Sequence, residues 1–130
     1  MNTKYLMIAS VIVTGLLGLG ATFLPQEILS YIGLPTTRVT TLALQIMGAL
    51  YLGFAMMNWM SREAIIGGIY SRPLVMGNFL HFMIAALALI KGISFETNLK
   101  YVWLITILYS LFALLFGVAL FTNPKKKNVD

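Results

Sequence analysis

The amino-acid sequence predicts an all-α membrane protein: a four-helix transmembrane bundle with a short amphipathic surface helix after the first spanning helix. Hydrophobic residues make up 59% of its 130 residues and charged residues only 10%, against about 25% charged residues in ordinary soluble domains. The mean hydropathy is +0.88, and four long stretches carry no charge at all. A soluble protein this small has too much surface for its volume to bury so many apolar side chains.

Each uncharged stretch is close to the length of a membrane span, because about 20 helical residues cross a hydrocarbon layer ~30 Å thick. Strands of a membrane barrel would instead alternate polar and apolar residues. The third stretch is the shortest of the four. We expect a single integral membrane domain over residues 1–130, with spanning helices at approximately 5–24, 39–60, 73–90 and 101–121.

The first stretch has an alternative interpretation as a cleaved signal peptide. Lys4 gives it a short basic start, and the run Gly18-Leu19-Gly20-Ala21 resembles a protease recognition site. The apolar stretch is longer than the usual core of a signal peptide, which favours a spanning helix.

A short helix is expected directly after the first span. Pro25 suits the first position of a helix, Glu27 suits its first turn, and Gly33 suits its end. Three apolar residues then fall on one side of the helix: Ile28, Leu29 and Ile32. This pattern predicts an amphipathic helix on the membrane surface, and the alternative is an irregular loop.

The ends of the second spanning helix carry two further predictions. Thr36 or Thr37 can cap its N-terminus through a side-chain oxygen. Beyond its C-terminus the apolar run 64–70 contains a Gly67-Gly68 pair, which is unfavourable in a helix. Either the helix extends to Ile66, or this run lies in the headgroup layer.

The positive charges predict the orientation in the membrane. With four spans, both termini and the second loop share one side, which holds six positive residues: Lys4, Arg62, Arg72, Lys125, Lys126 and Lys127. The opposite side holds three: Arg38, Lys91 and Lys100. The positive-inside rule therefore places both termini in the cytoplasm. No basic stripe interleaved with aromatic residues is present, so nucleic acid is not an expected partner.

Small side chains permit close helix packing in lipid, where the hydrophobic effect does not drive association. They recur along all four stretches: Ser10, Thr14, Gly18 and Thr22 in the first, Ala49 and Gly53 in the second, Ala85 and Ala88 in the third, and Thr106, Ser110, Ala113 and Gly117 in the fourth. These residues are expected at helix interfaces, either within one chain or in a homo-oligomer.

Polar residues inside the spanning stretches form the candidate site, because buried polar groups are costly in lipid and tend to be functional. Asn78 and His81 share a face of the third helix, and His81 lies about 12 Å from its start at 1.5 Å per residue. Asn58 is near the cytoplasmic end of the second helix, and Thr14 and Tyr109 occur at depths that can reach His81. The prediction is a polar pocket in the cytoplasmic half that binds a small amphipathic or lipid-like ligand.

The alternative for these residues is interhelical hydrogen bonding that fixes the bundle, worth only about 0.6 kcal/mol for each bond. Gln45 occurs nearer the opposite surface and is expected to make a separate contact.

The sequence lacks the residues that several kinds of functional site require. One histidine and no cysteine are too few for a typical zinc site, and no second axial ligand is marked for a haem on His81; no cofactor is indicated. The acidic residues all lie outside the spanning stretches: Glu27, Glu63, Glu96 and Asp130. His81 therefore has no acidic partner for hydrolysis, and the expectation leans toward a protein that is not an enzyme. Small proton-coupled exporters also need an embedded carboxylate, which is missing.

Two segments carry a resemblance to a known family: Tyr51-Leu52-Gly53-Phe54-Ala55-Met56-Met57-Asn58-Trp59 and Gly77-Asn78-Phe79-Leu80-His81-Phe82. With the short helix bounded by prolines, this layout resembles small four-helix bacterial membrane proteins of the DoxX-like kind. The resemblance implies a location in the bacterial cytoplasmic (inner) membrane. Some members are subunits of quinone-linked oxidoreductases, which implies a partner membrane subunit. An oligomeric transporter or channel is the third alternative. No catalytic residue transfers from this resemblance.

Overall fold

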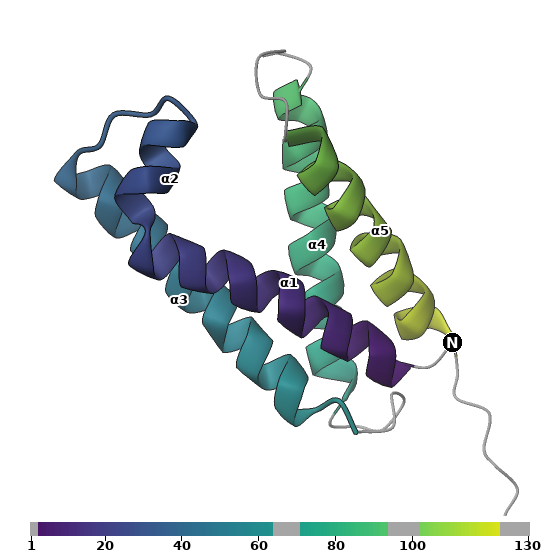
Figure 1. Ribbon diagram of the computed structural model, residues 1–130. Helices are drawn as coiled ribbons and strands as arrows, with labels where there is room; N and C mark the ends of the chain where they lie inside the picture. The colour runs from purple at the N-terminus through teal and green to yellow at the C-terminus, as the bar shows by residue number, and fades with distance from the viewer. Residues whose placement is uncertain (1–2, 64–70, 94–101, 123–130) are drawn as a thin grey trace, which may run out of the picture. The chain divides into compact units, whose positions relative to one another are not determined.

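The computed structural model describes residues 3–63, 71–93 and 102–122, and this part of the chain is folded into helices alone (Figure 1). The helices are α1 (Thr3–Phe23), α2 (Pro25–Tyr31), α3 (Arg38–Met60), α4 (Arg72–Ile93) and α5 (Val102–Phe121). Four of them, α1, α3, α4 and α5, are long and apolar enough to cross a membrane. The predicted all-α class and the predicted positions of the long helices are confirmed.

The boundaries of the long helices lie within a few residues of the prediction, with the largest difference in α4. This helix continues past Ile90 to Ile93 and has 22 residues, so it is longer than the uncharged stretch from which it was predicted. Lys91 lies in its last turn. A lysine stem can lie along apolar surface while its ammonium group reaches water, so this charge does not end the helix.

The short helix α2 follows its predicted signals. Pro25 occupies its first position and Glu27 its first turn. It ends at Tyr31, and Gly33 follows two residues later with a φ of 75°, in the left-handed region that favours glycine. Pro25 and Leu29 are its buried residues. Ile32, which was expected on the apolar face, follows the helix as its C-terminal capping residue and is 38% exposed.

The N-terminus of α3 is closed by a reciprocal pair of hydrogen bonds, and Thr37 rather than Thr36 is the capping residue. The Thr40 backbone N–H donates to Thr37 Oγ1 at 3.2 Å, and the Thr37 N–H donates to Thr40 Oγ1 at 2.9 Å. Two of the backbone donors that have no partner inside the helix are thereby satisfied.

The C-terminus of α3 lies at Met60, so the predicted alternative of an extension to Ile66 was wrong. Arg62 stacks its guanidinium over the Trp59 ring at 3.9 Å and donates from Nη1 to the Trp59 carbonyl oxygen at 2.6 Å. A cation that pairs with a terminal carbonyl favours the end of a helix. The apolar run 64–70 lies outside the described residues.

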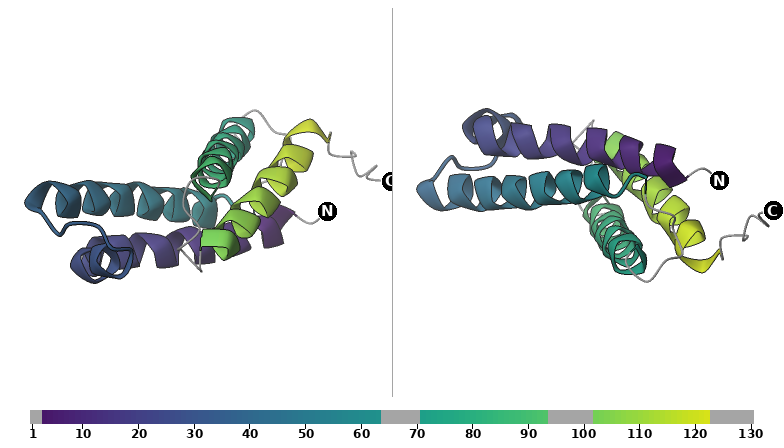
Figure 2. Two further views of the ribbon diagram at one scale, coloured as in Figure 1. Left: turned by 90° about the horizontal axis from the view of Figure 1, so that it is seen from above. Right: turned by 90° about the horizontal axis from the view of Figure 1, so that it is seen from below.

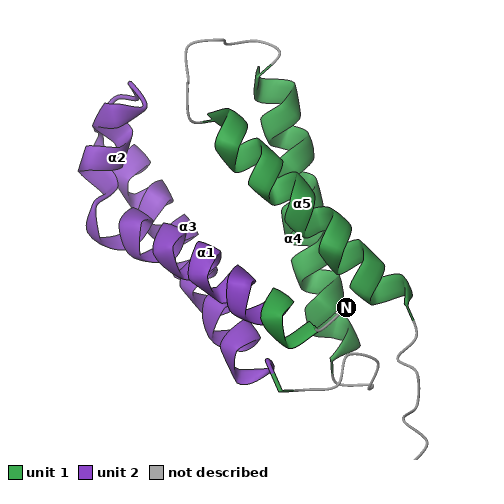
Figure 3. Ribbon diagram, turned by 45° about the vertical axis from the view of Figure 1, so that its right-hand side comes forward, with its two compact units in different colours: residues 1–6, 63–130 green, residues 7–62 purple. Residues whose placement is uncertain are grey.

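The chain divides into two compact units (Figure 3). Residues 7–62 form the first, which we call the α1–α3 unit, and residues 1–6 with 63–130 form the second, which we call the α4–α5 unit. In the α1–α3 unit, α1 and α3 lie side by side (Figure 2).

Glycine allows α1 and α3 to approach closely. A Cβ atom added to Gly18 would lie 3.0 Å from the Gly48 carbonyl oxygen, and one added to Gly48 would lie 3.0 Å from the Gly18 carbonyl oxygen. The Gly48 position would also be 2.5 Å from Thr22 Oγ1. Each glycine therefore carries only a Cα hydrogen where another residue would carry its Cβ. This hydrogen faces the carbonyl oxygen of the other glycine, which is the arrangement of paired Cα–H···O contacts.

Within this chain, the predicted small-residue face is buried on α1 except at the half-buried Thr22, and it is exposed on α3. Ser10, Thr14 and Gly18 are buried, whereas Ala49 and Gly53 are exposed, and a Cβ on Gly53 would meet nothing within 4 Å. The neighbouring small residues Gly48 and Ala55 are buried instead. Small residues are frequent enough in α3 that more than one face contains them.

Aromatic side chains hold α4 and α5 together in their unit. The Phe82 ring stacks on Phe112 with centroids 4.8 Å apart and on Phe116 at 5.6 Å, and Tyr109 meets it edge-on at 5.2 Å. Offset stacking and edge-to-face contacts are the favoured arrangements of such rings. Gly117 makes room for Phe79, whose ring carbon would lie 3.1 Å from an added Cβ.

The predicted interface of these two helices was thus only partly right. On α5, Thr106 is buried and Gly117 receives a neighbouring ring, but Ser110 and Ala113 are half-buried. On α4, Ala88 is exposed, and the fully buried line is Val75, Asn78, Phe82 and Ala86. Large rings, rather than small residues, form the centre of this contact.

Candidate ligand site

The polar residues of the α1–α3 unit gather around Ser10. Asn58 donates from Nδ2 to Ser10 Oγ at 2.9 Å, and Ser10 Oγ donates to the Met7 carbonyl oxygen at 2.7 Å. Thr14 Oγ1 donates to the Ser10 carbonyl oxygen at 2.7 Å. Ser10, Thr14 and Asn58 are all fully buried. The structure therefore brings two predicted site residues, Thr14 and Asn58, to a common neighbour.

These hydrogen bonds follow from the sequence positions. Ser10 and Thr14 are one helical turn apart on α1, and serine or threonine in a helix can bond to a carbonyl oxygen of the preceding turn. The serine hydrogen is used in that way, which leaves its oxygen lone pairs directed to accept from Asn58. The bond between Asn58 and Ser10 links residues 48 positions apart and ties the two helices together.

The other three predicted site residues lie in the α4–α5 unit. Asn78 is fully buried and donates from Nδ2 to the Leu74 carbonyl oxygen of its own helix at 2.9 Å. The half-buried His81 ring lies 5.8 Å from the Tyr109 ring and 5.0 Å from the Phe82 ring, measured between centroids. The predicted proximity of Tyr109 to His81 is confirmed.

The immediate surroundings of His81 are aromatic. Both ring neighbours offer π-faces and edges, and Tyr109 adds one hydroxyl group. Among the described residues, no group of three or more histidine, cysteine or acidic side chains is placed to hold a metal ion. In its own unit this arrangement suits packing against an apolar or amphipathic group better than proton transfer between paired side chains.

Gln45 makes the separate contact that was expected of it. Its Nε2 donates to the Thr22 carbonyl oxygen at 3.4 Å, near the end of α1. The bond is long and therefore weak.

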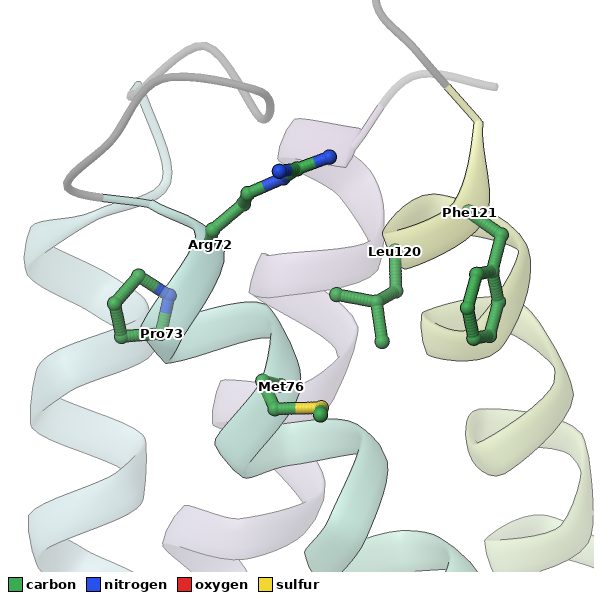
Figure 4. A pocket seen from close by; sticks show the side chains of 5 residues that line it. All are labelled: Arg72, Pro73, Met76, Leu120 and Phe121. Carbon is green, nitrogen blue, oxygen red and sulfur yellow. The ribbon is translucent and has the colours of Figure 1, made fainter.

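An open groove at one end of the α4–α5 unit was not predicted. It has a volume of about 590 Å³ and is lined by Arg72, Pro73, Met76, Leu120 and Phe121 (Figure 4). This volume lies in the range of about 300–1,000 Å³ that is common for small-molecule sites. The groove lies between the first turns of α4 and the last turn of α5.

The groove and Ser10 are the two functional features that sequence reasoning missed. In the predicted topology of four spans, the beginning of the third span and the end of the fourth lie at the same surface, so Arg72 and Phe121 could have been grouped from the sequence. Ser10 was predicted only as a small packing residue. Its four-residue spacing from Thr14 was the available signal.

Comparisons of the chain with protein-family models, with curated proteins and with solved structures gave no match. The chemistry of the described residues is therefore the basis for a function.

Proposed function

We propose that this chain is an integral membrane protein that crosses the bilayer four times, has both termini in the cytoplasm and binds an amphipathic, lipid-like ligand without transforming it. The observation that carries the proposal is the exposure of large apolar side chains along every long helix. Examples are Leu16 on α1 at 67%, Val39 on α3 at 75%, Ile84 on α4 at 63% and Leu114 on α5 at 68% exposed.

Acyl chains are the solvent that suits such surfaces. In water, each exposed apolar Å² would cost roughly 25 cal/mol relative to burial, whereas in hydrocarbon it costs nothing. Helices also close their backbone hydrogen bonds internally, as a hydrocarbon layer requires. The positions of the charges agree with this environment, because Arg38, Arg72 and Lys91 lie in the terminal turns of their helices.

Charge also supports the proposed orientation. Lys4 and Glu63 form an ion pair with Nζ 2.7 Å from Oε1, which joins the beginning of α1 to the turn after α3. Four spans require these two points to share one side of the membrane. That side also carries Arg62, Arg72 and the three lysines after α5, and an excess of positive charge is typical of the cytoplasmic side.

Binding is a better function for these residues than catalysis. The carboxylates among the described residues are Glu27, in the short helix, and Glu63, in the turn after α3. Neither lies in a long helix, where His81 is placed, so a general acid–base pair inside the hydrocarbon has no second member. A groove with apolar walls and a cation at its mouth instead matches an amphipathic molecule.

The topology can be tested with single cysteines, because the natural chain has none. Asn128→Cys follows α5, and Asn98→Cys lies between α4 and α5. In right-side-out membrane vesicles, a membrane-impermeant maleimide should label position 98 at once and position 128 only after permeabilisation. The cysteine-free chain is the control. The reverse pattern, or equal labelling at both positions, would contradict the proposed orientation.

A second candidate function is an accessory membrane subunit or a homo-oligomer, and α3 favours it. Of the 23 residues of α3, the buried ones are Gly48, Ala55 and Asn58, so most of its surface is open to lipid or to a partner helix. Oxidative cross-linking of Ile46→Cys on this surface distinguishes these occupants. Disulfide-linked dimers at native expression levels would favour association, whereas a monomer would favour lipid.

A further inference from the structure

The groove between α4 and α5 combines an apolar wall with a single cationic mouth. Met76 and Leu120 point toward each other from the two helices, while Arg72 extends beyond them at the end of the groove (Figure 4). Pro73 and Phe121 complete the lining. Polar surface is confined to one end of the groove, as in the binding site of a molecule with one charged end.

Arg72 is available to bind an anion. Its side chain is exposed, and none of the carboxylates among the described residues forms an ion pair with it. An arginine can hold a phosphate oxygen pair through two parallel N–H donors. The chain continues past Phe121 to Lys125, Lys126 and Lys127, which add positive charge four to six residues beyond the groove.

We propose that this groove binds one anionic phospholipid, with its phosphate at Arg72 and an acyl chain along Met76 and Leu120. This inference rests on the proposed membrane function, because it places Arg72 at the depth of the cytoplasmic headgroups. Basic pockets between helices on that side suit anionic headgroups. A neutral lipid would leave the guanidinium without a counter-charge, and a soluble anion would leave the apolar wall uncovered.

The test uses the full chain purified in a mild detergent, with phosphatidylglycerol or phosphatidylcholine of identical acyl chains added. Native mass spectrometry then reports the fraction of protein that retains each lipid. The natural chain should retain phosphatidylglycerol in preference. Arg72→Gln should lower that preference about fivefold, the effect of one cation at a headgroup. Leu120→Trp, which fills the apolar wall, should reduce retention of phosphatidylglycerol.

Matched controls separate this site from general attraction of lipid. Arg62→Gln removes an equal charge from the same proposed side of the membrane, at a guanidinium that stacks on Trp59, and should leave the preference unchanged. Leu114→Trp adds the same ring on an exposed part of α5. Helix content by circular dichroism should be the same for all four variants.

Three results would overturn the inference. The first is equal retention of both lipids by the natural chain, the second is an equal effect of Arg72→Gln and Arg62→Gln, and the third concerns the residues near His81. If His81→Leu with Asn78→Leu abolishes retention while Arg72→Gln does not, the groove is wrong and the proposed function stands with its ligand near His81. Failure of the membrane topology itself would appear in the cysteine labelling, independently of any lipid.

Discussion

At the scale of single residues, three predicted site residues in the long helices make hydrogen bonds inside their own unit. Thr14 and Asn78 donate to carbonyl oxygens of the preceding turn, and Asn58 donates to Ser10. Their inward positions could be predicted from the cost of polar groups in lipid. Their partners could not, because a serine or threonine can satisfy itself or a neighbour, and the choice depends on helix rotation.

The bond between Asn58 and Ser10 should contribute measurably to stability. We expect Asn58→Leu and Ser10→Ala each to lower the free energy of unfolding, with a coupling energy of about 0.6 kcal/mol between them, the average for hydrogen bonds between membrane helices. The measurement is a double-mutant cycle from unfolding by a denaturing detergent in mixed micelles. Strictly additive effects of the two substitutions would show that the bond contributes nothing.

The predicted site residues also show that the depth of a residue can be predicted more readily than its neighbours. Tyr109 was correctly predicted beside His81, since both occur at similar depths on helices that are neighbours in the sequence. The groove residues Arg72 and Leu120 were not predicted, because polarity inside a spanning stretch marks neither of them. A groove is made by the shapes of apolar side chains, which composition and periodicity do not describe.

At the scale of the elements, hydropathy predicts where the long helices lie, and local signals predict where α2 and α3 begin. Pro25 begins α2, Gly33 follows its end, and Thr37 caps α3. Each effect depends on the residue's own backbone or side chain, so it can be predicted from the sequence alone. By contrast, the face of α3 that contacts α1 is not the face that contains Ala49 and Gly53. Gly48 and Gly53 are equally small, so the sequence does not distinguish them, and only Gly48 contacts α1.

Alanine at these two glycines should have opposite effects on stability. In a helix, alanine is favoured over glycine by about 1 kcal/mol, so Gly53→Ala, whose Cβ meets open space, should be neutral or stabilising. Gly48→Ala would bring its Cβ within 2.9 Å of the Thr22 backbone nitrogen, and overpacking should cost about 1–3 kcal/mol. Both variants can be compared by thermal unfolding in one detergent. A stabilising Gly48→Ala would contradict the close approach of the helices.

At the scale of the whole molecule, the exposed apolar surface determines the behaviour of the protein. Large apolar side chains are exposed on each of the four long helices, whereas monomeric soluble proteins rarely expose contiguous apolar patches beyond a few hundred Å². Composition alone predicted this feature, because 130 residues with 59% hydrophobic content exceed what a small interior can hold. The positions of the helix pairs depend on shape complementarity, which composition does not contain.

The purified chain should therefore need a detergent or a lipid to remain dispersed. Dilution below the critical micelle concentration should cause aggregation within the time of a gel-filtration run, because the apolar faces of separate molecules then associate. The same protein diluted into buffer with detergent above that concentration is the control. A monodisperse peak in plain buffer would contradict both the membrane assignment and the proposals that depend on it.

The hydroxyl group of Ser10 also has a consequence for biosynthesis. Because its hydrogen is already bonded to Met7, α1 presents an acceptor to its surroundings as soon as it is made, whereas the carboxamide of Asn58 emerges from the ribosome 48 residues later. The earlier helix thus offers a hydrogen-bond acceptor to the buried carboxamide of the later one. In the proposed membrane protein, the acceptor on α1 is therefore present before the donor on α3 is made.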